Sequence, residues 1–163
     1  MQRLLAFGIV LLTVSPLWAA EASWKVGTAR AKINPEEPMW LAGYASRNHP
    51  ADGKLHDLWI KVLALEAADG SRGVLVTSDL LGFPRGISEA IFARVHERDG
   101  LERRQLVLTC SHTHSGPVLA GSLCDCYPLD DAQQALVRNY SDKLVETVAN
   151  AVHAALAERT EAT

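Results

Sequence analysis

The sequence has no excess of positive charge. Its 16 lysine and arginine residues are outnumbered by 19 acidic residues, which gives a formal net charge of −3. Proteins that bind nucleic acid normally carry a basic patch or stripe that neutralises phosphates. We therefore expect no nucleic-acid partner.

Long hydrophobic runs are also scarce. The longest, residues 4–14, follows a basic start at residues 1–3 and precedes an Ala-Glu-Ala triplet at residues 20–22. A membrane-spanning helix needs about 20 apolar residues, so this run is too short to span a bilayer comfortably. The pattern is typical of a secretory signal peptide. We predict that residues 1–22 are removed and that the protein is secreted or periplasmic.

Cysteine is rare, with three residues, although export would place them in an oxidising compartment. Three cysteines cannot all pair within one chain. A bridge between Cys124 and Cys126 would be strained, so Cys110 with either of them is the better candidate. A soft-metal site at the Cys-x-Cys pair is an alternative, and the sequence does not decide between them.

No internal repeat or low-complexity segment divides the chain, and its apolar segments predict an α/β fold. Residues 24–31, 58–66 and 73–78 have the composition of strands, and Asp69-Gly70 predicts a hairpin between the last two. A helix is predicted from Ile87 to Asp99-Gly100, followed by a strand at residues 105–109. A strand, a helix and a strand in this order predict a right-handed βαβ crossover. The expected fold is a mixed β-sheet with this crossover and flanking helices.

A long second helix is predicted at residues 132–158, with Asp131 as its cap. The polar residues 158–163 are expected to be a chain end and not a domain end. One apolar stripe along the helix consists of Leu136, Tyr140, Leu144, Val148, Val152 and Leu156.

The segment Cys-Ser-His-Thr-His-Ser-Gly-Pro at residues 110–117 is the most informative for function. It follows a predicted strand, and its Gly-Pro end predicts a loop at the carboxyl end of that strand, where open α/β sheets bind ligands. On such a loop His112 could bind a metal while His114 takes a different role nearby. Two solvated histidines are the alternative. Asp79, at the end of strand 73–78, is either a ligand or histidine anchor, or a turn or cap residue.

Together these residues resemble the neutral/alkaline (non-lysosomal) ceramidase family. The His-Thr-His-Ser-Gly-Pro motif at 112–117 is the specific match. Weaker matches follow the family order: Gly-Thr-Ala-Arg at 27–30 with Ile-Asn-Pro at 33–35, Leu-Ala-Gly-Tyr-Ala at 41–45, Gly53 to His56, and Val-Thr-Ser-Asp-Leu at 76–80.

The resemblance implies an exported zinc amidohydrolase that cleaves the N-acyl bond of ceramide-like lipids to a sphingoid base and a fatty acid. His112 would be a zinc ligand and His114 a catalytic histidine beside the metal, with His56 and Asp79 as further site candidates. The expected cofactor is zinc, and the expected partner is a ceramide-like lipid or another N-acyl substrate, reached by contact with a membrane surface.

The sequence also departs from the family pattern. Val118 stands where ceramidases continue with glycine, Lys32 stands where they have an acid, and the other zinc ligands and the catalytic serine segment would lie beyond residue 163. Residues 23–163 are therefore expected to be the N-terminal part of a larger catalytic domain, inactive alone. The alternatives are another metal-dependent exported hydrolase with an unknown amide or ester substrate, and a non-catalytic metal-binding exported domain.

Overall fold

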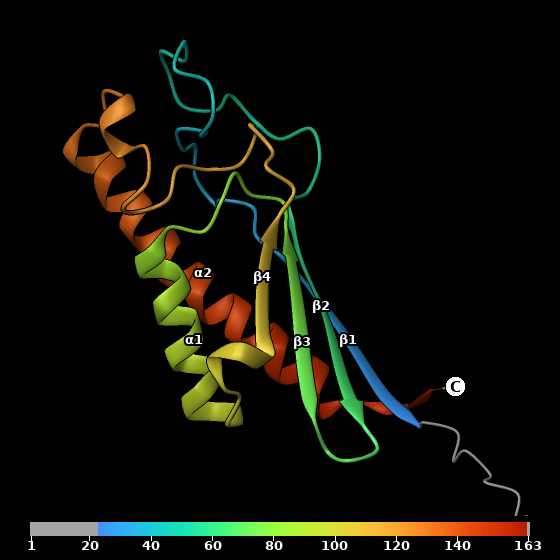
Figure 1. Cartoon of the computed structure of the whole chain (residues 1–163). Helices are drawn as coiled ribbons and strands as arrows, with labels where there is room; N and C mark the ends of the chain where they lie inside the picture. The colour runs from blue at the N-terminus through green and yellow to red at the C-terminus, as the bar shows by residue number, and fades with distance from the viewer. Residues whose placement is uncertain (1–22, 163) are drawn as a thin grey trace, which may run out of the picture.

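The computed structural model describes residues 23–162, so the predicted signal peptide at residues 1–22 lies outside the described residues. The chain folds into one five-stranded sheet with two α-helices (Figure 1). In chain order the elements are β1 (Trp24–Lys32), β2 (Trp59–Ala67), β3 (Arg72–Ser78), α1 (Arg85–Asp99), β4 (Leu106–Cys110), α2 (Asp131–Ala157) and β5 (Thr160–Ala162), with 3-10 turns at Arg103–Gln105 and Cys124–Cys126.

The sheet has the strand order β4-β3-β2-β1-β5 and is mixed. β1 pairs antiparallel with β2, and β2 forms the predicted hairpin with β3. β3 pairs parallel with β4, and α1 supplies the long connection that a parallel pair requires. The predicted α/β fold, with a mixed sheet, a βαβ crossover and flanking helices, is confirmed.

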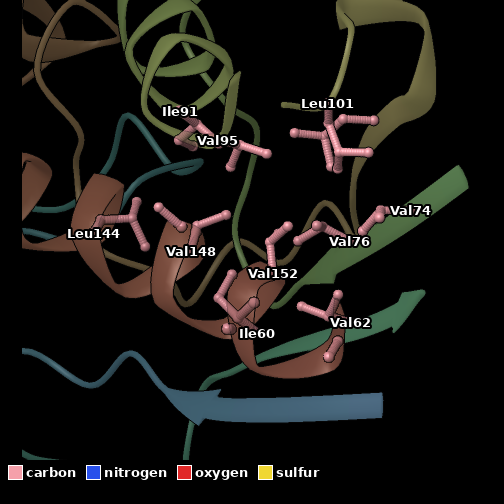
Figure 2. Packing of buried hydrophobic residues seen from close by; sticks show 14 of the residues in the cluster. Ile60, Val62, Val74, Val76, Ile91, Val95, Leu101, Leu144, Val148 and Val152 are labelled. Carbon is pink, nitrogen blue, oxygen red and sulfur yellow. The ribbon is translucent and has the colours of Figure 1, made fainter. Parts of the chain in front are cut away.

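The main hydrophobic core lies between one face of the sheet and the two helices (Figures 1 and 2). Alternate residues of β2 and β3 point to the helices, because successive side chains of a strand face opposite sides of the sheet. Ile60 and Val76 are fully buried there against Ile91 of α1 and Val148 of α2. The opposite face of the sheet stays partly open.

The predicted second helix is confirmed, but its cap is Asp130 and not Asp131. The Asp130 carboxylate accepts a hydrogen bond from the backbone N–H of Gln133 at 2.7 Å, which satisfies a donor that the first helical turn leaves free. Asp131 is the first helical residue. Most of the predicted stripe is buried, while its first two members, Leu136 and Tyr140, are half-buried.

Residues 160–162, for which the sequence predicted no strand, form an element of the sheet. These residues form β5, which pairs antiparallel with the start of β1 in the register Trp24↔Ala162. The pairing satisfies backbone groups of β1 that would otherwise lie on a sheet edge. Arg159 leads into β5 and forms an ion pair with Glu66 of β2 at 2.9 Å.

Neither helix within residues 23–162 has the length and apolar composition that crossing a membrane requires.

The packing of the core predicts a large effect for Ile60→Ala. The side chain is fully buried between the sheet and α2, so its truncation leaves a cavity and should lower the free energy of unfolding by about 2–5 kcal/mol. Leu75→Ala, on the open face of the adjacent strand, should change it by only about 0.5 kcal/mol. Urea denaturation followed by circular dichroism measures both, and equal losses would contradict the assignment of the core.

Candidate functional site

The predicted site residues lie at one end of the sheet, where the chain leaves β1, β3 and β4 and where β2 begins (Figure 1). The parallel ladder aligns Ser78 with Cys110, so Asp79 and Ser111 leave the sheet side by side. The backbone N–H of Ser111 still donates to the Ser78 carbonyl at 2.9 Å. The loop that carries His112 and His114 therefore starts from a fixed point.

His112 has the orientation expected of a metal-binding histidine. Its Nδ1 lies 2.8 Å from the carbonyl oxygen of Leu81, and because a carbonyl only accepts, Nδ1 carries the hydrogen. Nε2 is then left free on an exposed residue, and this is how a ligating imidazole is normally held by its second nitrogen. The residue also has φ of 58°, a backbone conformation that non-glycine residues adopt at a cost.

His114 lies beside His112. The ring centroids are 5.2 Å apart, and the ring planes meet at 68°. The ring of Tyr44 also lies close, 4.8 Å from the His114 ring in an edge-on arrangement. His114 Nδ1 is buried and has no hydrogen-bond partner within residues 23–162. A buried imidazole nitrogen without a partner is available for proton transfer or for a hydrogen bond to a ligand.

Gly43 is required for this packing. Its φ is 108°, and a Cβ at this position would lie 2.4 Å from Cγ of His114. The chain around Gly43 is also joined to the His loop by backbone hydrogen bonds, from Ala42 N–H to the Gly116 carbonyl and from Val118 N–H to the Trp40 carbonyl, both 2.8 Å. The segment that contains Gly43 thus forms one wall of the site.

A second, smaller apolar cluster supports these two loops. Trp40 and Tyr127 pack with ring centroids 5.5 Å apart, and the fully buried Val118 lies in the same cluster. The cluster also includes Val137 of α2, so the loops rest on a helix of the main fold. This gives the candidate site a rigid base.

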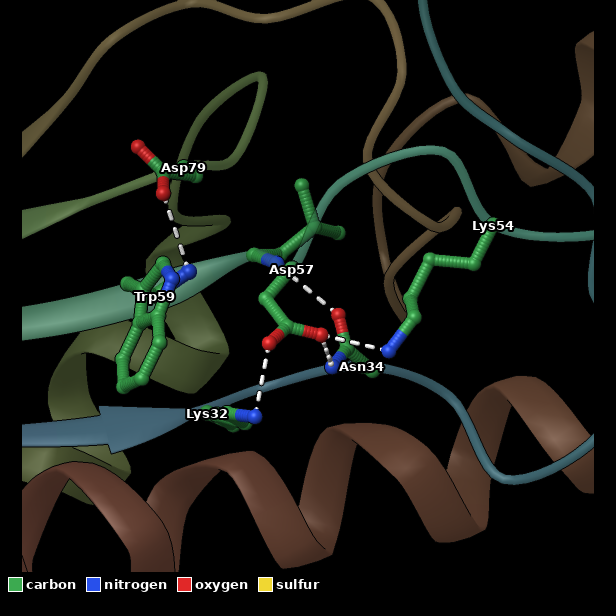
Figure 3. Close-up of polar contacts among 7 residues, drawn as sticks. Lys32, Asn34, Lys54, Asp57, Trp59 and Asp79 are labelled. Atoms are coloured by element: carbon green, nitrogen blue, oxygen red, sulfur yellow. Dashed lines mark hydrogen bonds and ion pairs between the residues drawn. The ribbon is translucent and has the colours of Figure 1, made fainter.

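Asp79 lies at the same end of the sheet, but its carboxylate is engaged with the backbone. Asp79 Oδ2 accepts from the N–H of Trp59 at 2.9 Å, and the Asp79 N–H donates to the Trp59 carbonyl at 3.0 Å (Figure 3). No hydrogen bond joins it to His112 or His114 among the described residues. Asp79 therefore fixes the start of β2 beside β3.

His56 is exposed and forms no hydrogen bond with the His loop in the described part of the chain. The carboxylate of its neighbour Asp57 forms ion pairs with Lys32, at 2.7 Å, and with Lys54 (Figure 3). It also accepts a hydrogen bond from the side-chain amide of Asn34 at 2.8 Å. Lys32, then Lys54 and Asn34, hold the pKa of Asp57 well below its usual range. The structure thus brings His112 and His114 together and leaves His56 apart.

The described residues contain no group of three or more His, Cys, Asp or Glu side chains that could hold a metal ion. His112 fits the role of one zinc ligand, but zinc sites normally use three or four protein ligands. The described residues alone therefore do not form a zinc site of the usual kind.

The sequence left the cysteine pairing open, with a bridge from Cys110 to Cys124 or Cys126 as the better candidate, and in the structure all three cysteines are free. Cys110 packs against the main core and accepts a hydrogen bond from Ser78 Oγ at 3.2 Å. Cys124 instead packs against the second cluster, beneath the loops. The thiols of Cys110 and Cys124 therefore pack in different apolar clusters, which their spacing in the sequence could not reveal.

Comparison with known proteins gives structural matches only. No known protein family and no curated protein matches the sequence significantly. Among solved structures, the neutral ceramidase from Pseudomonas aeruginosa superposes with a TM-score of 0.69 at 21% sequence identity, over 86% of this chain. The fold is that of a segment of neutral ceramidase. A second structure, a ceramidase complexed with C2, matches with a TM-score of 0.67 at 20% identity, and this chain spans 22% of the length of either ceramidase.

Two residues near the site were not predicted. Tyr44, in the Gly-Tyr-Ala segment, contacts His114 through its ring, and Arg47 donates to the His114 carbonyl at 2.7 Å. The Gly-Tyr pair carried a signal through its resemblance to ceramidases. Arg47 carried none, because it lies in a polar loop and meets the His loop only in the folded chain.

We predict that Gly43→Ala destabilises the protein and displaces His114. The positive φ alone should cost more than about 1 kcal/mol, and the added methyl group would overlap the imidazole. Gly53→Ala is the matched control, since a Cβ there meets nothing within 4 Å. Urea denaturation and the NMR signals of the His114 ring measure the two effects. If both variants behave alike, the close contact between Gly43 and His114 is wrong.

The lowered pKa of Asp57 predicts a pH-dependent contribution to stability. A carboxylate whose pKa is depressed by folding stabilises the protein above its unfolded pKa, near 4, and this contribution is lost as the pH falls toward the folded value. Asp57→Asn should therefore lower the thermal midpoint at pH 7, and the deficit should shrink below about pH 4. Thermal denaturation across pH tests this, and a deficit independent of pH would contradict it.

Proposed function

We propose that this chain is part of an exported zinc-dependent amidohydrolase that cleaves the N-acyl bond of ceramide-like lipids to a sphingoid base and a fatty acid. The observation that carries the proposal is the arrangement of His112, whose Nδ1 is held by the Leu81 carbonyl so that Nε2 is free beside His114. The fold supports it, because solved structures with the same fold are ceramidases.

The two histidines take different roles in this proposal. His112 would hold the metal through Nε2, in the tautomer that its hydrogen bond to Leu81 sets. Zinc would supply Lewis-acid polarisation of the amide carbonyl and would make water a better nucleophile. His114, with its ring centroid 5.2 Å from that of His112, carries a proton to the leaving amine as a general acid.

Other groups at this end of the sheet hold the site in place. Asp79 fixes the start of β2 through the backbone of Trp59, and the segment around Gly43 packs on His114. His112 is exposed, and under this proposal the lipid substrate reaches it from a membrane surface. Among residues 23–162, neither His56 nor Asp79 forms a hydrogen bond with His112 or His114, so we assign neither to the chemistry.

The proposal predicts separate effects for the two histidines in the complete protein as its source cells make it. His112→Ala should lose zinc, measured by mass spectrometry of the metal, together with hydrolysis of a fluorescent ceramide. His114→Ala should keep the zinc but lose about 10²–10⁴-fold in turnover. His96→Ala, on the exposed side of α1, is the control and should retain both zinc and activity.

Three results would overturn parts of the proposal. A purified complete protein without zinc would remove the metal-dependent mechanism. Hydrolysis of other N-acyl or ester lipids, with ceramides left intact, would support the hydrolase activity but refute ceramide-like lipids as its substrates. Robust turnover by residues 23–163 alone would show that the described residues suffice for catalysis.

A further inference from the structure

The contacts around His114 extend beyond the two histidines, to Arg47 in the polar loop before β2. We infer that Arg47 is a positioning residue, which holds the backbone and the ring of His114 in the orientation that catalysis requires. The inference rests on the catalytic role proposed above for His114. Arg47 itself does not touch the reacting atoms.

Arg47 joins two loops through one guanidinium group. Its Nη2 donates to the carbonyl oxygen of His114 at 2.7 Å, and its Nη1 donates to the carbonyl oxygen of Ala42 at 3.3 Å. The planar guanidinium holds these two donors in a fixed geometry, so it also fixes the distance between the two carbonyls. Lysine, with a single flexible ammonium group, can reproduce one of these bonds but not their spacing.

The same guanidinium positions the aromatic wall of the site. Its Cζ lies 5.0 Å from the centroid of the Tyr44 ring, within the range of a cation–π interaction. The Tyr44 ring in turn contacts the His114 ring edge-on at 4.8 Å. Arg47 therefore acts on His114 twice, through its backbone carbonyl and through the ring that packs against its imidazole.

The rest of the His loop shows why this contact matters. His112 is held by the Leu81 carbonyl, and Gly116 and Val118 are held by backbone bonds to the segment around Gly43. Between these anchors, and within residues 23–162, the hydrogen bond from Arg47 is the only one to His114. Without it, His114 would be held by packing against Gly43 and Tyr44 but by no hydrogen bond among the described residues.

This role predicts a specific kinetic result for Arg47→Ala in the complete protein. Zinc content should be unchanged, kcat should fall by about 10- to 100-fold, and KM should change by less than about threefold, because small misplacements of a catalytic group mainly slow the reaction. Arg47→Lys should recover part of kcat.

Arg85→Ala is the matched control, since Arg85 is exposed at the start of α1 and forms no hydrogen bond or ion pair among the described residues. A rise in KM with unchanged kcat would overturn the positioning role.

A second measurement does not depend on activity. In histidine-labelled protein, the ring signals of His114 are identified by their loss in His114→Gln, and their nuclear Overhauser contacts with the Tyr44 ring are recorded. Arg47→Ala should lose these contacts, and Arg47→Lys should weaken them and serve if the alanine variant fails to fold. Contacts that persist in Arg47→Ala would overturn the inference. Lost contacts with normal ceramide hydrolysis would support the positioning of the ring and instead refute the catalytic role of His114.

Discussion

In the parallel ladder between β3 and β4, Ser78 lies opposite Cys110, and the position of the candidate site depends on this alignment. The hydroxyl group of Ser78 is buried and lies 3.0 Å from the Thr109 carbonyl oxygen and 3.2 Å from the Cys110 sulfur, so it links the two strands where they end. The backbone bond from Ser111 then extends the pairing by one residue. The loop with the two histidines thus leaves a structure with little freedom.

Two residues that follow this ladder, His112 and His114, adopt energetically unfavourable arrangements. His112 adopts a positive φ, and His114 keeps a buried nitrogen without a partner among the described residues; neither would persist on an isolated loop. The ladder, the hydrogen bond from His112 to the Leu81 carbonyl and the packing of His114 against Gly43 together stabilise the arrangement. Strain of this kind is expected where a backbone must present a side chain for a task, and here it coincides with the residues that the sequence motif marked.

The sequence predicted the elements of this arrangement better than their contacts. The hairpin, the crossover and the His loop each have local signals, in the Asp69-Gly70 turn, in the helical spacing from Ile87 and in the Gly116-Pro117 break. β5 was missed because its three residues have no apolar pattern. They form a strand because their backbone pairs with the free edge of β1, a contact that exists only in the folded chain.

The contacts of the site could not be predicted for a related reason. Arg47 meets a carbonyl 67 residues further along the chain, and nothing in the polar loop at residues 46–54 distinguishes it from the solvated charges around it. The cysteine spacing left the pairing open. In the structure all three cysteines are free, and Cys110 and Cys124 pack in separate apolar clusters, which their spacing did not indicate.

The orientation of His112 is set by its neighbours within the described residues, and this would matter for a zinc site of the kind proposed. The imidazole is fixed by contacts within the described residues, through Leu81 and the end of β4, and does not depend on other ligands for its direction. If His112 holds zinc as proposed, further ligands would not have to organise this histidine, and a preorganised first ligand would lower the entropic cost of forming the site. Under the proposal, the contribution of this α/β segment is therefore the direction of one ligand.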